Sequence, residues 1–370
     1  MVSYPSSKIR RKVYSERLCF SGGIDSSLAA LFLKEEGYDL IGVTFRTWDY
    51  ISEGCWEKQK GCCSIDSIME AKNFAKKIGI PHHVLDLREH FKNTVISEFV
   101  SEYLVGRTPN PCVRCNAETK WGEVIKLADD LGCKYVSTGH YAQVRKENDR
   151  YVLSRGADES KDQSYFLWML TQENLARTIF PLGKWIKSDI KKQAASRGLV
   201  KLAEKRESQE ICFIPENNYR DFLKEQVPDI DKNIGEGNFI STEGKILGKH
   251  KGFPYYTIGQ RKGLGIALGE PRFVVAINPL KNEIILGSYE DLVSHNLSIS
   301  KINLIKYSEI KANQKVEIKI RFRTPPIAAS LLPEGDFIVI TTQESMHAVA
   351  PGQSAVFYEG NDVVGGGIIM

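Results

Sequence analysis

A short segment near the N-terminus constrains the fold of this chain more than any other feature. Residues Ser21–Ser27 read S-G-G-I-D-S-S and lie between an apolar run, residues 18–20, and a helical pattern that ends at Gly37. Two glycines let the backbone approach a phosphate closely because they carry no Cβ atom. The helix that follows directs free N–H groups and the positive end of its dipole at the loop. The sequence therefore predicts a strand, an anion-binding loop and a helix, in that order.

The loop differs from two common phosphate-binding motifs. No lysine follows its glycines, as a Walker A loop requires, and the spacing is not the G-x-G-x-x-G of dinucleotide-binding folds. The alternative interpretation is an ordinary strand-to-helix turn in which Asp25 or Ser26 caps the helix. The strand–loop–helix context favours the anion site.

Composition sets the class of protein. With 370 residues, 42% hydrophobic and 26% charged, the chain is long enough for two or three domains and typical of soluble globular proteins. No apolar run approaches the length of a membrane span, so we expect no membrane partner. The basic segment before residue 18 lacks the apolar stretch of a secretory signal, and we interpret it as a disordered leader, with a short transit peptide as the alternative. A net charge of +4 permits an RNA partner without requiring one.

Strands and helices alternate in the first part of the chain. The strand patterns cover residues 40–45, 84–87 and 135–138, and the helical patterns cover 66–78, 91–104 and 116–131. Such alternation predicts an α/β fold with a doubly wound parallel sheet, in which ligands bind beyond the carboxyl ends of the strands. Gly22, Phe45 and Gly139 fall at such ends.

The pattern changes twice in the second part of the chain. It is mostly helical from about residue 155 to residue 203, and short strands dominate from Phe273 on. The clearest strand is 315–322, in which apolar and polar side chains alternate strictly. This tail predicts a small antiparallel barrel.

Cysteines are concentrated before this tail. All eight lie at or before Cys212, whereas a secreted disulfide scaffold is usually shorter and spreads its cysteines, so we expect a cytoplasmic location. Cys112 and Cys115 lie three residues apart, just before a helical pattern. A thiol near a helix N-terminus has a lowered pKa, and Arg114 adds positive charge, so both cysteines are candidates for reactive thiolates.

Less reactive roles for these cysteines are the alternatives. Packed cysteines are common, and a zinc site completed by Cys62 and Cys63 would also use this pair. Cys212, between two apolar residues, would on its own be interpreted as a core cysteine.

Motifs along nearly the whole chain resemble those of the tRNA-specific 2-thiouridylases, which are N-type ATP pyrophosphatases. The matching stretches are Ser21–Ser27, Gly106–Pro111, Thr138–Ala142, Lys161–Leu167, Phe180–Gly183, Ser208–Phe213, Tyr255–Gly265 and Pro351–Gln353. Each is weakly diagnostic, and together in this order they are highly specific. The resemblance implies a Rossmann-like ATP pyrophosphatase domain over residues 1–212, a small central domain over 213–285 and a tRNA-contacting antiparallel β-barrel over 286–370.

The resemblance also implies roles for individual residues. Cys115 matches the nucleophile, Cys212 the cysteine that carries persulfide sulfur, and Cys112 a catalytic position beside the target base. The implied ATP site comprises Cys19, Phe20, Ser21, Gly22, Gly23, Ile24, Asp25, Ser26, Ser27, Phe45 and Gly139. The implied tRNA-contacting positions are Asn110, Pro111, Cys112, His140, Lys161, Asp162, Gln163, Arg321, Phe322 and Gln353. Without the resemblance, 161–163 would be interpreted as a solvated loop and Arg321 as the outward face of a strand.

The implied reaction is 2-thiolation of the wobble uridine in a tRNA anticodon stem-loop. ATP, with Mg²⁺ on its phosphates, adenylates uracil O2, which is otherwise a poor leaving group. An upstream sulfur-carrier protein would load Cys212 with a persulfide, and Cys115 would attack it, either freeing sulfide or ending in a disulfide with Cys212. The base must leave the anticodon stack to react. The tRNAs implied are those for lysine, glutamate and glutamine.

One position departs from the family pattern. Family members commonly carry aspartate where this chain has Cys112, and a carboxylate or a thiolate there could serve as a general base. Three thiols, those of Cys112, Cys115 and Cys212, could also converge, and three cysteines with an open fourth site can hold a [4Fe–4S] cluster. Sulfur delivery through such a cluster is the alternative to the persulfide route.

Two other functions are alternatives from different classes. A ligase that uses ammonia on a small molecule would share the loop but would not need paired cysteines or a barrel. A zinc-stabilised, non-catalytic RNA-binding protein predicts bound zinc and no AMP, and the intact loop with Asp25 argues against it.

Overall fold

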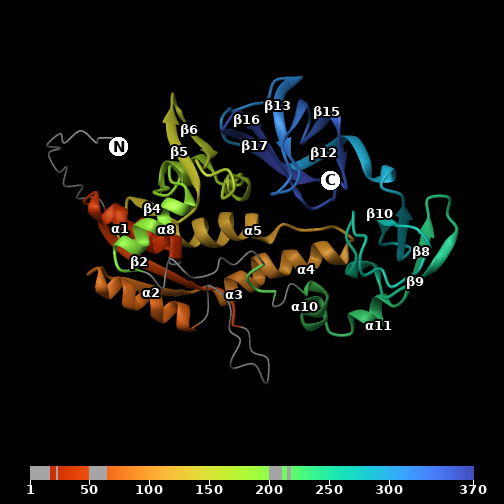
Figure 1. Cartoon of the computed structure of the whole chain (residues 1–370), viewed down its shortest axis with the longest axis horizontal. Coiled ribbons are helices and arrows are strands. Elements are labelled where there is room, and N and C mark those ends of the chain that lie inside the picture. The colour runs from red at the N-terminus through yellow and green to blue at the C-terminus, as the bar shows by residue number, and fades with distance from the viewer. Residues whose placement is uncertain (1–16, 22–23, 50–64, 200–210, 215–217) are drawn as a thin grey trace.

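A parallel sheet forms the first part of the molecule (Figure 1). The structure, a computed structural model, describes residues 17–21, 24–49, 65–199, 211–214 and 218–370. The predicted roles of Gly22, Gly23, Cys62 and Cys63 therefore lie outside the described residues. The sheet has the strand order β3-β2-β1-β4-β7. Its strands are β1 (Arg17–Ser21), β2 (Asp39–Arg46), β3 (His82–Asp86), β4 (Tyr135–Ser137) and β7 (Thr178–Ile179).

Helices cover both faces of this sheet. Ile41 and Val43 of β2 pack with the helix over 122–130, whereas Leu40, which points to the other face, packs with the helix over 24–35. Successive strand residues point to opposite faces, so the predicted doubly wound sheet is confirmed. The helices of this part are α1 (Ile24–Glu35), α2 (Ile65–Lys77), α3 (Arg88–Phe91), η1 (Lys92–Ile96), α4 (Ser97–Leu104), α5 (Pro111–Arg114), η2 (Cys115–Trp121), α6 (Gly122–Asp130), η3 (Ser164–Leu167), α7 (Gln172–Ala176) and α8 (Lys187–Ser196).

Two of the predictions for this part need correction. The helix predicted from residue 116 begins at Pro111, because proline fits the first helical position, where no N–H partner is needed. Sequence analysis also missed the hairpin of β5 (Ala142–Glu147) and β6 (Arg150–Arg155). Its turn contains Asn148 at a φ of 51°, a left-handed conformation that asparagine tolerates.

The central part is small and mixed. Helices α10 (Tyr219–Gln226) and α11 (Ile230–Ile234) precede a four-stranded sheet in the order β10-β11-β8-β9. Its strands are β8 (Gly237–Ser241), β9 (Ile246–His250), β10 (Phe273–Asn278) and β11 (Glu283–Gly287), with short 3₁₀ turns η5 (Phe253–Tyr255) and η6 (Glu290–Leu292).

The C-terminal part is the predicted antiparallel barrel. Its strands are β12 (Val293–Leu304), β13 (Gln314–Lys319), β14 (Ile327–Glu334), β15 (Phe337–His347), β16 (Ser354–Glu359) and β17 (Asp362–Ile369). The order β12-β15-β14-β13-β16-β17 closes because β12 also pairs with β17. The hairpin β5–β6 extends this sheet, since Ser154 lies opposite Asp362 of β17.

Two hydrophobic cores join the three parts. Tyr165 and Trp168 of the first part pack with Val356 and Tyr358 of the barrel. The fit is close, because a Cβ atom added to Gly366 would lie 2.7 Å from the Trp168 ring. A second core joins α4 to the central part and is described below. None of the described helices combines the length and hydrophobicity that crossing a bilayer requires.

Candidate active site

The carboxyl edge of the parallel sheet brings several predicted ATP-site residues together. β1 ends at Ser21 opposite Val43, so Phe45 near the end of β2 lies at the same edge. Asp25, Ser26 and Ser27 form the first turn of α1, where the helix directs its free N–H groups, and both serines are buried. The backbone of Cys19, Phe20 and Ser21 lies in β1, and Ile24 begins α1.

Gly139 lies against the start of α1. A Cβ atom at this position would come within 2.6 Å of the Ser26 backbone nitrogen and 2.7 Å of the Asp25 Cβ atom. Only glycine fits without displacing the first turn of α1. The segment after β4 and the start of α1 therefore form one packed unit.

Sequence analysis missed a lysine at this edge. Lys187 opens α8, is 8% exposed, and its Nζ donates to Asp25 Oδ1 at 2.6 Å. The Tyr141 hydroxyl donates to the same oxygen at 3.1 Å. Its distance from Asp25 in the sequence hid Lys187, although it follows the matching stretch 180–183 by four residues. A buried ammonium beside the end of a glycine loop is suited to neutralising phosphate charge.

One continuous helical rod carries Cys112 and Cys115. It runs from α5 through the π-helical η2 into α6, and the two cysteines lie three residues apart on one side. π-helical segments inside α-helices often occur at functional sites. At the far end of η2, the buried Trp121 ring lies 5.7 Å from the ring of His140. The rod therefore connects the cysteines to the segment that follows Gly139.

The electrostatics of Cys112 differ from the prediction. Cys112 is exposed, yet desolvation by the surrounding protein raises the pKa of its thiol, and only the charge of Lys120 opposes that shift. Arg114 does not supply the predicted field, since its guanidinium binds Glu98 at 2.8 Å and Glu118 at 2.6 Å. The expected lowering of the Cys112 pKa is therefore wrong, because desolvation outweighs the helix N-terminus.

Cys212 lies on a short turn beside an aromatic cluster. Phe213 and Ile214, which follow it, are buried in this cluster, and Cys212 itself is exposed. Phe213 contacts Phe91, Phe99 and Phe222, with ring centroids 5.2–5.5 Å apart. Cys115, partly buried, packs against the same cluster. Cys115 and Cys212, the two predicted sulfur-handling residues, therefore lie beside the same hydrophobic cluster, one on the helical rod and the other on the turn.

The arrangement does not support the predicted iron–sulfur alternative, and the zinc alternative, which needs Cys62 and Cys63, lies outside the described residues. Across the described ranges, no three Cys, His, Asp or Glu side chains are placed so that they could hold a metal ion. The thiols of Cys112, Cys115 and Cys212 thus do not form a three-cysteine site here.

The predicted tRNA-contacting residues of the first part are mostly engaged with protein. His140 is 8% exposed, binds Thr138 Oγ1 through Nδ1 at 2.7 Å, and burial lowers its pKa well below the ordinary value. Asp162, also buried, accepts from the backbone N–H groups of Gly156 and Ser164. Gln163 accepts from the Tyr141 N–H at 3.0 Å, while Lys161 is partly exposed. The interpretation of 161–163 as a solvated loop is wrong, because Asp162 organises its fold.

Of the three predicted residues of the barrel, Phe322 and Gln353 contact the first part, whereas Arg321 bonds within the barrel. Arg321 donates to the Ala348 carbonyl at 2.6 Å, and the Phe322 ring lies 4.5 Å from that of Phe166. Gln353 donates from Nε2 to the carbonyl oxygens of Thr108 and Pro109, each at 3.0 Å. Pro109 immediately precedes Asn110, a partly buried residue, and Pro111 is buried.

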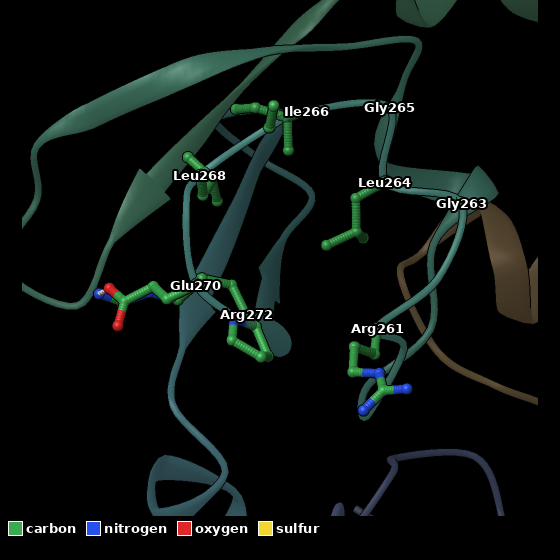
Figure 2. Close-up of a pocket in the computed structure, with 10 residues that line it drawn as sticks. Arg261, Gly263, Leu264, Gly265, Ile266, Leu268, Glu270 and Arg272 are labelled. Atoms are coloured by element: carbon green, nitrogen blue, oxygen red, sulfur yellow. Dashed lines mark hydrogen bonds and ion pairs between the residues drawn. The ribbon is translucent and has the colours of Figure 1, made fainter.

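A separate cavity lies in the central part. Its volume is about 730 Å³, and the segment 261–272 lines it. Leu264, Ile266 and Leu268 surround the hollow, and Arg261 lies at its edge (Figure 2). None of the predicted catalytic, ATP-site or tRNA-contacting residues lines this cavity.

Family models match the chain in three consecutive pieces. Residues 17–216 match the tRNA methyl transferase HUP domain, residues 220–288 the tRNA methyl transferase PRC-barrel domain, and residues 294–369 the aminomethyltransferase beta-barrel domain. Among solved structures, an NMN synthetase from Francisella tularensis is similar over 58% of this chain and 77% of its own, at 13% identity and a TM-score of 0.34, which is too low to support an argument.

Curated relatives match nearly end to end. A tRNA-specific 2-thiouridylase MnmA from Amoebophilus asiaticus is 49% identical over 95% of this chain and 94% of its own. The protein of that name from Cytophaga hutchinsonii is 49% identical over 95% and 96%, and the one from Salinibacter ruber is 48% identical over 95% and 93%.

Proposed function

We propose that this chain, which belongs to the tRNA-specific 2-thiouridylase family, replaces O2 of a tRNA uridine with sulfur at the expense of ATP. The observation that carries the proposal is the helical rod over residues 111–130. It carries Cys112 and Cys115 at one end, and Trp121 on it packs against His140, next to Gly139 at the edge of the parallel sheet. This rod would link the proposed sulfur site to the proposed adenylation site through the contact of Trp121 with His140.

The adenylation step would use the edge of the sheet. The first turn of α1 would bind the phosphates of ATP through backbone N–H groups and the Ser26 hydroxyl. Lys187 would exchange its bond to Asp25 for the phosphates and stabilise the charge that develops when uracil O2 attacks the α-phosphorus. Pyrophosphate leaves, and the oxygen becomes part of a good leaving group, AMP.

Magnesium would accompany the nucleotide rather than occupy a site built by protein alone. Mg²⁺ commonly binds through substrate phosphates and one or two carboxylates. Asp25 is a carboxylate in the first turn of α1, and one of its oxygens is engaged by Lys187 and Tyr141. The side chain fits a single contact to such an ion once Lys187 turns to the phosphates.

The sulfur step would use the two cysteines that border the aromatic cluster. An upstream sulfur-carrier protein would leave a persulfide on the exposed Cys212. The terminal sulfur of that persulfide would attack C2 of the adenylated uracil, and AMP would leave with the oxygen. The Cys115 thiolate would attack Sγ of Cys212, so that the two cysteines are oxidised to a disulfide while the transferred sulfur is reduced to the thiocarbonyl level. A cellular thiol would then reduce the disulfide.

Cys112 would act at the target base as a neutral group. Because its thiol pKa is raised, it is protonated near neutral pH and suits hydrogen-bond donation to the uracil better than proton abstraction. Lys120, whose charge acts on both Cys112 and His140, would add a positive charge beside the adenylated intermediate.

A defined assay tests the proposal. The protein is incubated with an unmodified tRNA transcript for glutamate, ATP, Mg²⁺ and a small-molecule persulfide, and the nucleosides are analysed by mass spectrometry. We expect 2-thiouridine at the wobble position in amounts equal to the AMP formed, and none without ATP. A methylated nucleoside, or AMP without thiolation in the presence of persulfide, would contradict the proposal.

A further inference from the structure

The barrel forms hydrogen bonds with residues 107–110, the segment that leads into the helix carrying Cys112 and Cys115. The turn over residues 351–353 lies against residues 107–110, with the Thr108 N–H donating to the Pro351 carbonyl at 2.7 Å. Arg107 adds a bond to the Ile369 carbonyl of β17 at 3.2 Å and an ion pair with Glu102 at 2.7 Å. The position of Asn110, Pro111 and the first turn of α5 is thus set by contacts with the far end of the chain.

Gly352 makes this close approach possible. Its φ is 91°, a conformation that other residues rarely adopt, and a Cβ atom would lie 2.8 Å from the Thr108 carbonyl oxygen. The backbone of the turn can therefore lie directly on the segment 107–110.

The Gln353 side-chain amide adds two hydrogen bonds to this contact. Its Nε2 carries two hydrogens, and two carbonyl oxygens, those of Thr108 and Pro109, lie 3.0 Å away, which fixes the orientation of the amide. Both donors are then used inside the protein, and only Oε1 is left to accept a bond from another molecule. Pro109 and Pro111 have no N–H groups, so this segment cannot secure itself by backbone donors of its own at those positions.

We infer that Gln353 is a positioning residue, which holds the segment 108–110 and thereby fixes the start of the helix that carries Cys112 and Cys115. Its effect on thiolation rests on the proposed function, whereas its role in holding the segment 108–110 does not. A residue that acted only through RNA would have its consequence in tRNA binding. A positioning residue has its consequence in the protein without RNA.

Hydrogen–deuterium exchange of the RNA-free protein tests this inference. Gln353→Met removes both donors and keeps the length of the side chain, and Gln353→Glu keeps an acceptor but removes the donors. We expect amide exchange over residues 106–113 to rise about tenfold in both variants, and alkylation of the exposed Cys112 to change with it. Exchange in β16 and β17 stays at the wild-type rate.

Gln172→Met is the matched control. Gln172 also donates from Nε2 to two carbonyl oxygens between the first part and the barrel, those of Tyr151 and Ile305, at 2.9 and 3.0 Å, but it does not touch residues 107–110. This variant should leave exchange over 106–113 unchanged.

The outcomes separate the inference from the proposed function. Unchanged exchange over 106–113 in Gln353→Met, or a loss of protection that extends through the whole barrel, would overturn the positioning role. Faster exchange over 106–113 in the variants, together with no tRNA thiolation by the wild-type protein, would support the positioning role of Gln353 and contradict the proposed function. If both hold, kcat for thiolation falls in both variants while KM for tRNA changes little in Gln353→Met.

Discussion

The two cysteines assigned to sulfur chemistry are held in different ways. Cys115 lies inside a continuous helical rod, at the junction of α5 and η2, and that rod is packed into the core shared with the barrel through Val113 and Trp121. Cys212 lies on a short turn outside any helix or strand, and it is fixed to the core by the two residues that follow it. One thiol is thus placed by an element, and the other by side-chain anchors.

This difference matches two tasks that sulfur transfer would impose. A residue that must accept sulfur from a second protein has to be exposed, as Cys212 is, and a short turn makes approach from outside possible. A residue that must attack at one defined point benefits from a rigid helix. Phe99, Phe213 and Phe222 belong to one aromatic cluster that lies beside both the helix carrying Cys115 and the turn carrying Cys212.

Removing either thiol gives the largest expected effect. Cys212→Ser and Cys115→Ser should each lower persulfide-dependent thiolation by at least about 10³-fold, because each removes a bond-forming sulfur. ATP binding should be unchanged in both. Thiolation is measured as 2-thiouridine, and ATP binding by calorimetry. Retained thiolation by Cys212→Ser would remove its assigned role as sulfur carrier.

We expect the next largest effect when Lys187 is replaced at the proposed ATP-binding edge of the sheet. Lys187→Met removes the buried ammonium bound to Asp25, and AMP formation should fall about 10²–10³-fold. The control is Lys192→Met on the same helix, where the lysine is exposed and pairs with Asp189. Equal AMP formation by the two variants would contradict the phosphate role of Lys187.

The aromatic anchor of Cys212 should have a large effect on stability. Phe213 is 2% exposed, and Phe213→Ala should lower the free energy of unfolding by about 3–5 kcal/mol. Leu280→Ala, at a residue that is 98% exposed, should change it by less than about 0.5 kcal/mol. Urea titration measures both. A small loss in Phe213→Ala would mean that side-chain anchors do not hold the Cys212 turn.

The smallest effect is a shift in the titration of Cys112. Thiolate is the reactive form, and a raised pKa leaves less of it at a given pH. Alkylation of Cys112, followed by peptide mass spectrometry, should therefore reach half its maximal rate at a higher pH than alkylation of a cysteine in an unstructured peptide. Lys120→Met should move that pH higher still, because the lysine charge lowers this pKa. A midpoint below that of the peptide would restore the predicted reactive thiolate.

The alternating apolar pattern was enough to predict the layers of the fold. The strand predicted over 315–322 is present as β13 (Gln314–Lys319), because Val316 and Ile318 repeat at intervals of two and are buried in the barrel. It ends three residues earlier than predicted, so Arg321 and Phe322 lie beyond the strand. The hairpin over 142–155 was missed because its outer strand is largely polar, and it is held by pairing with β17 more than two hundred residues later. Local patterns do not contain such long-range partners.

In the candidate site, too, residues with a local sequence signal could be predicted, and residues placed by long-range contacts could not. Asp25 and Gly139 could be predicted, since a glycine loop and a strand end are local signals. Lys187 could not, because only the fold brings α8 to the start of α1. The sign of the Cys112 pKa shift was also out of reach, since it depends on how much protein surrounds the thiol and on Arg114 being paired with two glutamates.

A single-turnover experiment tests the central claim most directly. Cys212 is loaded with a ³⁵S-labelled persulfide under anaerobic conditions, the iron and zinc contents of the same sample are measured, and unmodified tRNA is added with ATP and Mg²⁺. We expect labelled 2-thiouridine, AMP in equal amount and a new disulfide between Cys115 and Cys212, with no dependence on bound iron or zinc. Thiolation that requires bound iron, or label that never leaves Cys212 for the tRNA, would contradict it.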